Sequence, residues 1–430
     1  MKIALVSAFP PSGRQLNEYG LHLARELQRN PLLSLTIVGD ELGNCDFATD
    51  AHGNKITASE ELPDFDVVRT WRFNSVSNPY RLLKTLRELK PDVVWFNLVF
   101  SSFATQDYPI AAFAGLSTPA LTRAAGFYTH VTLHHLMEHV DMGAANIKAE
   151  RLFRFASTVA TRMLLMANSI SVLLPAYRRT LMDKYRAANV HFRSHGILGA
   201  RPEPPDFRTR GNPDRRILAI GHWGTYKRLE TLMEAFPEIV RRVPNAKLMV
   251  AGANHHTKPG YWESFAEKFR GNDRIEFLGY VKEDDIPSLF SQSSMVVLPY
   301  DSSTGSSGPA HQACQFGVPI VSSDLHEFMD MATDESMAVE FFRRGDAKDL
   351  ADKIVGVLND PEKERAMAEQ NFSTAMRMTM PQIIRDYLRA FDVQKRSSTV
   401  HAGRFRRFSR WTAARSGEGF RYGGWSPWVQ

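Results

Sequence analysis

Residues 302–320 read SSTGSSGPAHQACQFGVPI and combine three local signals. The part up to Gly308 consists of small residues, so a ligand could come close to several backbone N–H groups. Pro309 suits the first turn of a helix, because its missing N–H is not needed there. Gly317 suits the end of that helix, and Pro319 precedes an apolar strand. The stretch therefore predicts a loop, a helix whose N-terminus can face an anion, and a strand. An ordinary connection between a helix and a strand is the alternative.

Strands and helices alternate on both sides of this stretch. Apolar runs predict strands at 2–8, 35–38, 67–71, 92–97, 131–134, 170–173 and 190–193, and again at 217–221, 247–251, 275–278, 295–299 and 338–341. Residues 199–214, GARPEPPDFRTRGNPD, have the composition of a linker. The pattern predicts an α/β protein with two doubly wound parallel sheets and a cleft between them. Ligands of such sheets bind at the carboxyl ends of the strands.

The composition is that of a soluble globular protein. The chain has 430 residues, of which 43% are hydrophobic and 23% charged, enough for two or three domains. Its two cysteines, Cys45 and Cys314, give neither a disulfide framework nor metal-ligand spacing, so we expect a cytoplasmic location. We interpret the N-terminal MKIALVSAFPPSG as a first strand and not as a signal peptide. No run of about 18 apolar residues predicts a membrane-spanning helix.

The net charge of +6 comes from the C-terminal tail. From Lys395 onward there are eight basic residues and one acid, Glu418, so the rest of the chain carries about −1. Nucleic-acid binding by the main body is therefore not expected. Among the arginines of the tail stand Phe405, Phe408, Trp411, Phe420, Tyr422, Trp425 and Trp428. Such a tail could contact an anionic membrane surface, a partner or nucleic acid, or it could be disordered or folded back on the body.

An ordered set of motifs runs through residues 1–392. The set consists of Pro10-Pro11-Ser12-Gly13, His134, His195-Gly196-Ile197, Gly221 through Lys227-Arg228, Gly279-Tyr280-Val281 and Gly317-Val318-Pro319-Ile320. In this order and spacing it resembles family 4 retaining glycosyltransferases of the GT-B fold. The resemblance implies two Rossmann-like domains, at 1–198 on the acceptor side and at 215–378 on the nucleotide-sugar side. It also implies a linker at 199–214 and a helix at 379–394 that crosses back to the first domain, before a tail at 395–430.

The resemblance also implies an activity. Such enzymes move a sugar from a nucleotide-diphosphate sugar to an acceptor, retain the anomeric configuration and need no metal and no cofactor. The acceptor would be a glycan, a lipid-linked molecule or a small molecule, as in polysaccharide biosynthesis. The enzyme would be hexosyltransferase-like and cytoplasmic, with peripheral contact at the inner membrane face through the 395–430 tail.

The site residues follow by matching motifs, and two of them depart from the family. The resemblance implies a catalytic His134 and donor-binding residues Gly13, His222, Lys227, Thr304, Gly305, Ser306, Ser307 and Gln312. Thr304 and Gln312 stand where the family has the two carboxylates of Glu-x7-Glu, and His222 stands where it has an arginine. A glutamine accepts one hydrogen bond and donates another, so ribose binding would be weaker or changed. A catalytically weak or inactive binding protein with this fold is the alternative, and a phosphorylase or synthase that uses phosphate is a third.

Several of these residues have plainer interpretations. His134, His135, Glu138 and His139 could suggest a metal site, but HHLMEH is no standard metal motif. A histidine that touches the donor sugar or the acceptor fits this position better. Arg14 could contact a phosphate or the acceptor, or could be a solvated surface side chain. Without a metal, the charge on a departing diphosphate would have to be met by Lys227 and the helix N-terminus.

Overall fold

The computed structural model describes residues 1–43, 64–139, 150–198, 201–207, 214–224, 226–255, 258–302 and 305–394. The chain divides into two compact units, Met1–Ile384 and Arg385–Gln430. The basic tail at 395–430 lies outside the described residues, as do 199–200 and 208–213 of the predicted linker at 199–214. Residues 380–394 are helical, and the return of the 379–394 helix to the first domain stays a prediction, as do the domain boundaries.

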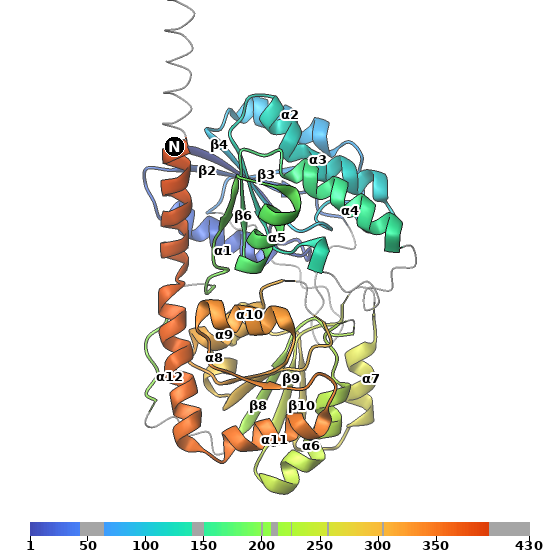
Figure 1. Ribbon diagram of the computed structural model, residues 1–430, viewed down its shortest axis with the longest axis vertical. Helices are drawn as coiled ribbons and strands as arrows, with labels where there is room; N and C mark the ends of the chain where they lie inside the picture. Colours follow the sequence, from blue (N-terminus) through green and yellow to red (C-terminus); the bar gives the residue numbers. More distant parts are fainter. Residues whose placement is uncertain are drawn as a thin grey trace, which may run out of the picture. The chain divides into compact units, whose positions relative to one another are not determined.

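The first part of Met1–Ile384 is built on a parallel sheet that contains seven strands of the described residues (Figure 1). The strands are Lys2–Val6 (β1), Ser34–Asp40 (β2), Val67–Trp71 (β3), Val93–Leu98 (β4), Thr129–Leu133 (β5), Ser169–Val172 (β6) and Val190–Phe192 (β7). Their order in space is β3-β2-β1-β4-β5-β6-β7. The helices are Asn17–Gln28 (α1), Asn78–Leu89 (α2), Pro109–Ala124 (α3), Glu150–Leu164 (α4) and Pro175–Tyr185 (α5), with a 3₁₀ turn at Met137–His139.

A second parallel sheet follows, with six strands among the described residues. They are Arg216–Ile220 (β8), Lys247–Ala251 (β9), Ile275–Gly279 (β10), Met295–Leu298 (β11), Ile320–Ser323 (β12) and Val339–Phe342 (β13), in the order β10-β9-β8-β11-β12-β13. The helices are Glu230–Arg242 (α6), Tyr261–Lys268 (α7), Ile286–Ser291 (α8), Gly308–Gln315 (α9), His326–Glu335 (α10), Ala347–Leu358 (α11) and Pro361–Arg377 (α12). A short 3₁₀ turn, Glu283–Asp285, precedes α8.

The predicted α/β architecture with two doubly wound sheets is confirmed. Helices lie on the faces of both sheets, so central strands such as β4 (VVWFNL) are buried along their whole length. Strands covered on both faces appear in the sequence as continuous apolar runs, which is why the strand predictions hold. In each sheet the first strand has neighbours on both sides, from β2 and β4 or from β9 and β11, so the strand order reverses there. Such a switch point opens a crevice at the carboxyl edge.

Helix α9 forms where residues 302–320 predict it. Its N-cap is Ser307, whose hydroxyl accepts a hydrogen bond from the N–H of Ala310, and Pro309 is its second residue. The chain leaves the helix through Gly317 at φ +58°, a left-handed conformation in which glycine has no steric cost. Strand β12 then pairs with β11 through Val296 and Ile320.

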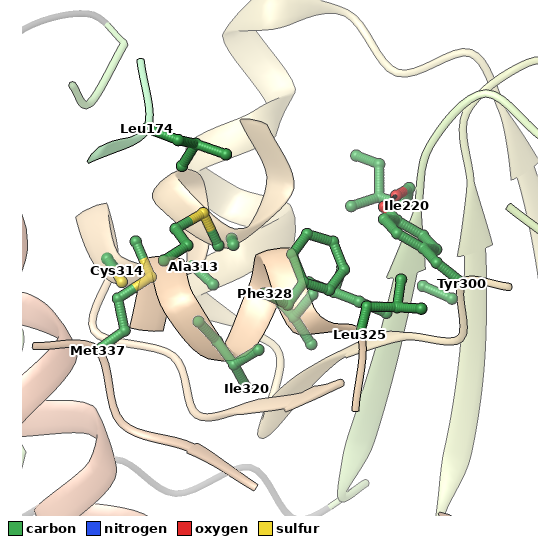
Figure 2. Packing of buried hydrophobic residues seen from close by; sticks show 14 of the residues in the cluster. Leu174, Ile220, Tyr300, Ala313, Cys314, Ile320, Leu325, Phe328 and Met337 are labelled. Atoms are coloured by element: carbon green, nitrogen blue, oxygen red, sulfur yellow. Dashed lines mark hydrogen bonds between the residues drawn. The ribbon is translucent and has the colours of Figure 1, made fainter. Parts of the chain in front are cut away.

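An apolar cluster anchors α9. Buried side chains from both sheets and their helices belong to the same hydrophobic cluster. Figure 2 shows Leu174, which precedes α5, and Ala313 and Cys314 of α9 among the buried side chains of this cluster. Tyr300 and Ile220, from the ends of β11 and β8, lie close together in the same view. Because Ala310 also belongs to the cluster, α9 is anchored along its inner side.

Two glycines let the ends of β8 and β9 approach closely. Gly252 has φ +105°, and a Cβ placed on it would lie 1.9 Å from the carbonyl oxygen of Gly221. No side chain fits at that distance, and residues other than glycine seldom adopt this φ. The contact fixes the backbone where β8 passes into the loop that carries Lys227.

We expect Gly252→Ala to destabilise the protein by about 3 kcal/mol or more, because the methyl group adds a backbone clash to a strained φ. Gly356→Ala is the matched control. Gly356 lies exposed within α11, and a methyl group added to it would meet nothing within 4 Å. Alanine there should therefore stabilise the protein by about 0.5–1 kcal/mol. Urea unfolding measures both changes, and equal free energies of unfolding for the two variants would contradict the account.

Candidate functional site

The predicted site residues come from loops at the carboxyl edges of the two sheets. His134 directly follows β5, and Gly221 directly follows β8. Lys227 pairs through its backbone with Tyr300, which follows β11 after one residue, and Gly305 precedes α9. Parallel sheets gather their ligand-binding loops at this edge, so the placement agrees with the expected position of a site.

Lys227 is a half-buried cation. Its Nζ lies 4.7 Å from the centroid of the Tyr300 ring, a cation–π distance. A Cβ on Gly221 would lie 3.5 Å from the same Nζ, so the glycine leaves room for the lysine. Burial lowers the pKa of Lys227 to about 8, and among the described residues no carboxylate lies within ion-pairing distance of it. An anion that reached Nζ would relieve the cost of this desolvated charge.

The N-terminus of α9 lies next to this lysine. The Nζ of Lys227 lies over the ring of Tyr300. The hydroxyl of Tyr300 is within hydrogen-bonding range of the Ser307 side chain. Ser307 caps α9, and a Cβ on the following Gly308 would meet nothing within 4 Å. Pro309 has no N–H and the Ala310 N–H donates to Ser307, so the first turn offers an anion the Gly308 N–H and a partial positive charge. Lys227 and the start of α9 together form a site suited to an anion.

His134 is held neutral and in one tautomer. Its Nε2 lies 2.7 Å from the Oδ1 of Asn97 on β4, and the Nδ2 of Asn97 donates to the hydroxyl of Ser7, which directly follows β1, at 3.0 Å. An amide oxygen only accepts, so Nε2 carries the proton and Nδ1 keeps its lone pair. Burial, and secondarily the nearby His195 and His135, hold the pKa of His134 well below its usual value. The ring is therefore a neutral hydrogen-bonding group at pH 7.

The structure brings Gly305 against His134. A Cβ on Gly305 would lie 2.8 Å from the carbonyl oxygen of His134 and 3.6 Å from the Cβ of His135. Only glycine allows this approach between the loop before α9 and the end of β5. The predicted residues His134, Gly305, Ser307 and Lys227 thus belong to one continuous region.

The two neighbours on α9, His311 and Gln312, differ in burial. His311 is fully buried, and its Nε2 lies 2.9 Å from the Oε2 of Glu335 at the end of α10. Burial alone would lower the pKa of His311, but the carboxylate of Glu335 raises it. Ser194 donates to the other oxygen of Glu335 at 2.9 Å, which ties α10 to the segment after β7. Gln312 is half-buried.

Buried hydrogen bonds to Asp40 fix the loop that contains Gly13. Buried Asp40 accepts hydrogen bonds from the Ser12 hydroxyl at 2.5 Å and from the Phe9 N–H at 3.1 Å. Arg14 stacks on Phe73, with its Cζ 3.6 Å from the ring centroid, and its Nε is 3.7 Å from Asp40. Arg14 is thus a packed residue of the loop, and its interpretation as a solvated side chain is wrong. Gly13 itself is exposed.

The remaining predicted residues are placed less completely. Thr304 lies outside the described residues, Ser306 is half-buried, and His222 is exposed beside buried Trp223. The three histidines of HHLMEH diverge: His134 contacts Asn97, His135 packs near Phe100, and His139 lies 3.0 Å from the Thr180 hydroxyl. The described residues contain no group of three or more His, Cys, Asp or Glu side chains that could hold a metal ion.

Sequence reasoning missed Asn97, Tyr300 and the His311–Glu335 pair. Asn97 is the polar residue near the end of an otherwise apolar strand, and Tyr300 follows Pro299 at the end of another. Polar or aromatic residues at the ends of strands were the sequence pattern that could have identified both as site residues. The pairing of His311 with Glu335 had no such signal, because it depends on how α9 and α10 pack.

Comparison with known proteins agrees with this arrangement. Residues 203–374 match the family model described as glycosyl transferases group 1. The chain is 25% identical over 250 residues to the uncharacterized glycosyltransferase YqgM of Bacillus subtilis, covering 56% of this chain and 66% of that protein. It is 28% identical over 173 residues to the alpha-D-kanosaminyltransferase of Streptomyces kanamyceticus, covering 38% and 42%. The alignments thus span less than two thirds of these relatives' own lengths.

Solved structures show the same fold. The sucrose-phosphate synthase of Thermosynechococcus elongatus superposes with a TM-score of 0.68 at 16% identity, covering 91% of this chain and 99% of that one. Anabaena HepE in complex with UDP-glucose superposes with a TM-score of 0.65 at 14% identity, covering 91% and 100%. At such low identity the likeness establishes the two-domain GT-B fold, which the sequence had predicted.

Asn97→Asp should raise the pKa of His134 by about 1 or more, because a carboxylate keeps the hydrogen-bond acceptor and adds a charge that favours the imidazolium. Asn97→Leu is the control that removes the acceptor without adding charge. It should leave the ring neutral and cost about 1–3 kcal/mol of stability. Titration of the His134 ring by NMR measures the pKa. A wild-type ring that titrates near 6.5 would contradict the neutral assignment.

Proposed function

We propose that this protein is a retaining glycosyltransferase that takes a sugar from a nucleotide-diphosphate donor without a metal ion. The observation that carries the proposal is Lys227, a half-buried cation that lies beside the N-terminus of α9. Both groups favour negative charge, and a diphosphate needs two such partners when no metal is present. The match of 203–374 to a glycosyl transferase model and the glycosyltransferase relatives support the same assignment.

The chemistry follows from where charge develops. When the bond between the anomeric carbon and the diphosphate oxygen breaks, the electron pair moves to that oxygen. Lys227 and the positive N-terminal end of α9 stabilise this charge more strongly in the transition state than before it. The acceptor hydroxyl forms the new bond to the anomeric carbon and passes its proton to the departing diphosphate, so atoms and charge balance.

His134 would act as a positioning group for the sugar. In the tautomer fixed by Asn97, Nδ1 can accept a hydrogen bond from a sugar hydroxyl. Gly305 lies against the backbone of His134, so the loop before α9 and the histidine would contact the same sugar. A neutral ring is suited to this task, because a positively charged imidazolium would attract the diphosphate of the donor to the position of the sugar.

UDP is the nucleotide we propose to test first, since the HepE neighbour was solved with UDP and UDP-glucose. The half-buried Gln312 would accept one hydrogen bond from the ribose and donate another. Thr304 would replace a carboxylate at the donor sugar. The acceptor would be a glycan, a lipid-linked molecule or a small molecule, and the enzyme would work in the cytoplasm.

A binding protein without catalytic activity is the second candidate. The observation that favours it is that Thr304 and Gln312 stand where the family resemblance implies two carboxylates. Such a protein would bind the nucleotide but transfer no sugar. Sugar transfer that disappears when Lys227 is replaced would exclude it.

Lys227→Gln should weaken UDP binding about 10- to 100-fold, because a hydrogen bond to a charged group contributes about 1.5–3 kcal/mol. Lys268→Gln is the matched control, since Lys268 is an exposed lysine on α7 and should bind UDP like the wild type. Isothermal titration calorimetry measures both dissociation constants, and circular dichroism confirms folding. Failure of the wild type to bind UDP, GDP or ADP at millimolar concentration would contradict the proposal.

UDP affinity should fall as the pH rises through 8. With a pKa of about 8, Lys227 is about nine-tenths protonated at pH 7 and about one-tenth at pH 9. The binding constant should therefore fall about tenfold between these values, with proton uptake on binding near pH 8. Lys227→Arg stays charged throughout and should show a flat profile. A wild-type profile as flat as that of the arginine variant would show that Lys227 does not bind the nucleotide.

A further inference from the structure

His311 on α9 is a buried titratable side chain that the proposed reaction does not use. It is fully buried, and each of its two ring nitrogens meets an acceptor. Nδ1 lies 2.8 Å from the carbonyl oxygen of Ser307, and Nε2 lies 2.9 Å from the Oε2 of Glu335 at the end of α10. Burying a polar ring costs free energy that an apolar side chain in the same space would not cost. The contacts of His311 therefore need an explanation beyond filling space.

The two acceptors require two protons on the ring. A carbonyl oxygen only accepts, so Nδ1 carries a proton. Nε2 and Oε2 need a second proton between them, because two lone pairs at 2.9 Å would repel each other, and neither atom has another hydrogen-bond partner among the described residues. An ordinary imidazole has a pKa of about 6.5 and an ordinary Glu carboxyl one of about 4.3, so this proton belongs on the ring. The geometry thus favours an imidazolium paired with a carboxylate.

Of the described groups around His311, Glu335 is the charged one that faces it. The ring of His195, in the segment after β7, lies 4.8 Å from the His311 ring, and burial lowers the pKa of His195 to about 3, so that ring is neutral. Burial, and secondarily the Glu335 carboxylate, raise the pKa of the Cys314 thiol on α9, so the thiol is neutral too. Asp334, which precedes Glu335 in the chain, is exposed. The imidazolium therefore depends on the carboxylate of Glu335.

His311 holds the peptide unit at the start of α9. Its Nδ1–H, and its backbone N–H at 3.1 Å, both donate to the carbonyl oxygen of Ser307. That carbonyl belongs to the same trans peptide as the N–H of Gly308, and the C=O and N–H of a planar trans peptide point in opposite directions. Fixing the carbonyl along the helix therefore directs the Gly308 N–H away from the helix end. A charged donor on the carbonyl also polarises the peptide, which makes this N–H a stronger donor.

We propose that His311 is a positioning residue for the diphosphate of the donor, which acts through the peptide between Ser307 and Gly308, and that Glu335 keeps it in its charged form. This inference rests on the proposed function, because the anion at the Gly308 N–H would be that diphosphate. The ion pair as a whole is neutral, so its effect on the anion is one of direction and not of attraction at a distance. His311 itself is buried behind the helix start and touches no ligand.

The protonation state of His311 tests the first step without any ligand. In the full chain labelled with ¹⁵N at histidine, an imidazolium shows two protonated ring nitrogens by NMR, whereas a neutral ring shows one. We expect two for His311 at pH 7 and one in Glu335→Gln, where burial without the carboxylate leaves the ring neutral. The glutamine keeps the volume and an acceptor for Ser194, so it removes the charge alone. A neutral His311 in the wild type would overturn the inference and leave the proposed function standing.

Anion binding tests the second step. Isothermal titration calorimetry at pH 7 should show that Glu335→Gln and His311→Gln bind UDP and inorganic pyrophosphate about fivefold more weakly than the wild type, because charge-assisted hydrogen bonds are about twice as strong as neutral ones. With ¹⁵N-glycine labelling, the amide resonance of Gly308 should move downfield when pyrophosphate is added, and should move less in either variant. A residue that only supported the fold would change the thermal stability and leave this shift unchanged.

A matched variant and the wild type complete the design. Glu369→Gln replaces an exposed glutamate on α12, whose nearest cation is Arg365 at 3.8 Å, and should bind both anions like the wild type. Wild-type affinity in Glu335→Gln and His311→Gln would overturn the inference alone. Failure of the wild type to bind either anion would overturn it together with the proposed function. If neither variant folds, the wild-type protonation state and Gly308 shift decide, and a Gly308 amide that pyrophosphate does not move would contradict the inference.

Discussion

The desolvation of one lysine is the constraint on which the site depends. Lys227 is kept partly away from water, against the ring of Tyr300, and its pKa is lowered to about 8. Keeping a charged ammonium group away from water costs free energy, and a bound anion would offset that cost. The α9 N-terminus, capped by Ser307 and open beside Gly308, supplies the second positive end. The proposed binding of a diphosphate without a metal rests on these two groups together.

The rest of the architecture holds these two groups in place. Gly252 and Gly221 let the ends of β8 and β9 touch, which sets the start of the Lys227 loop. The inner side of α9 is fixed by the buried His311–Glu335 pair and by the apolar packing of Ala313 and Cys314. A buried pair of this kind is costly to form and costly to break, so it favours one arrangement over others. Function here rests on packing that lies away from the ligand.

Much of this could be predicted from the sequence, and the limits have physical causes. Strands such as β4 are buried on both faces and show as apolar runs, and α9 carries its own start and stop residues, Pro309 and Gly317. Lys227 and Gly305 follow from the spacing of motifs. The role of Asn97 could not be predicted, because a tautomer depends on a neighbour in another strand. The contacts of His311 and Arg14 depend on tertiary packing, and Thr304 stays a prediction.

A crystal structure of the protein with UDP-glucose tests the central claim most directly. We expect the diphosphate between the Nζ of Lys227 and the Gly308 N–H at the start of α9, at hydrogen-bond distances and without a metal. We also expect the ribose at Gln312 and a sugar hydroxyl at the Nδ1 of His134. A diphosphate held by a metal ion, or one bound away from Lys227 and α9, would contradict the account.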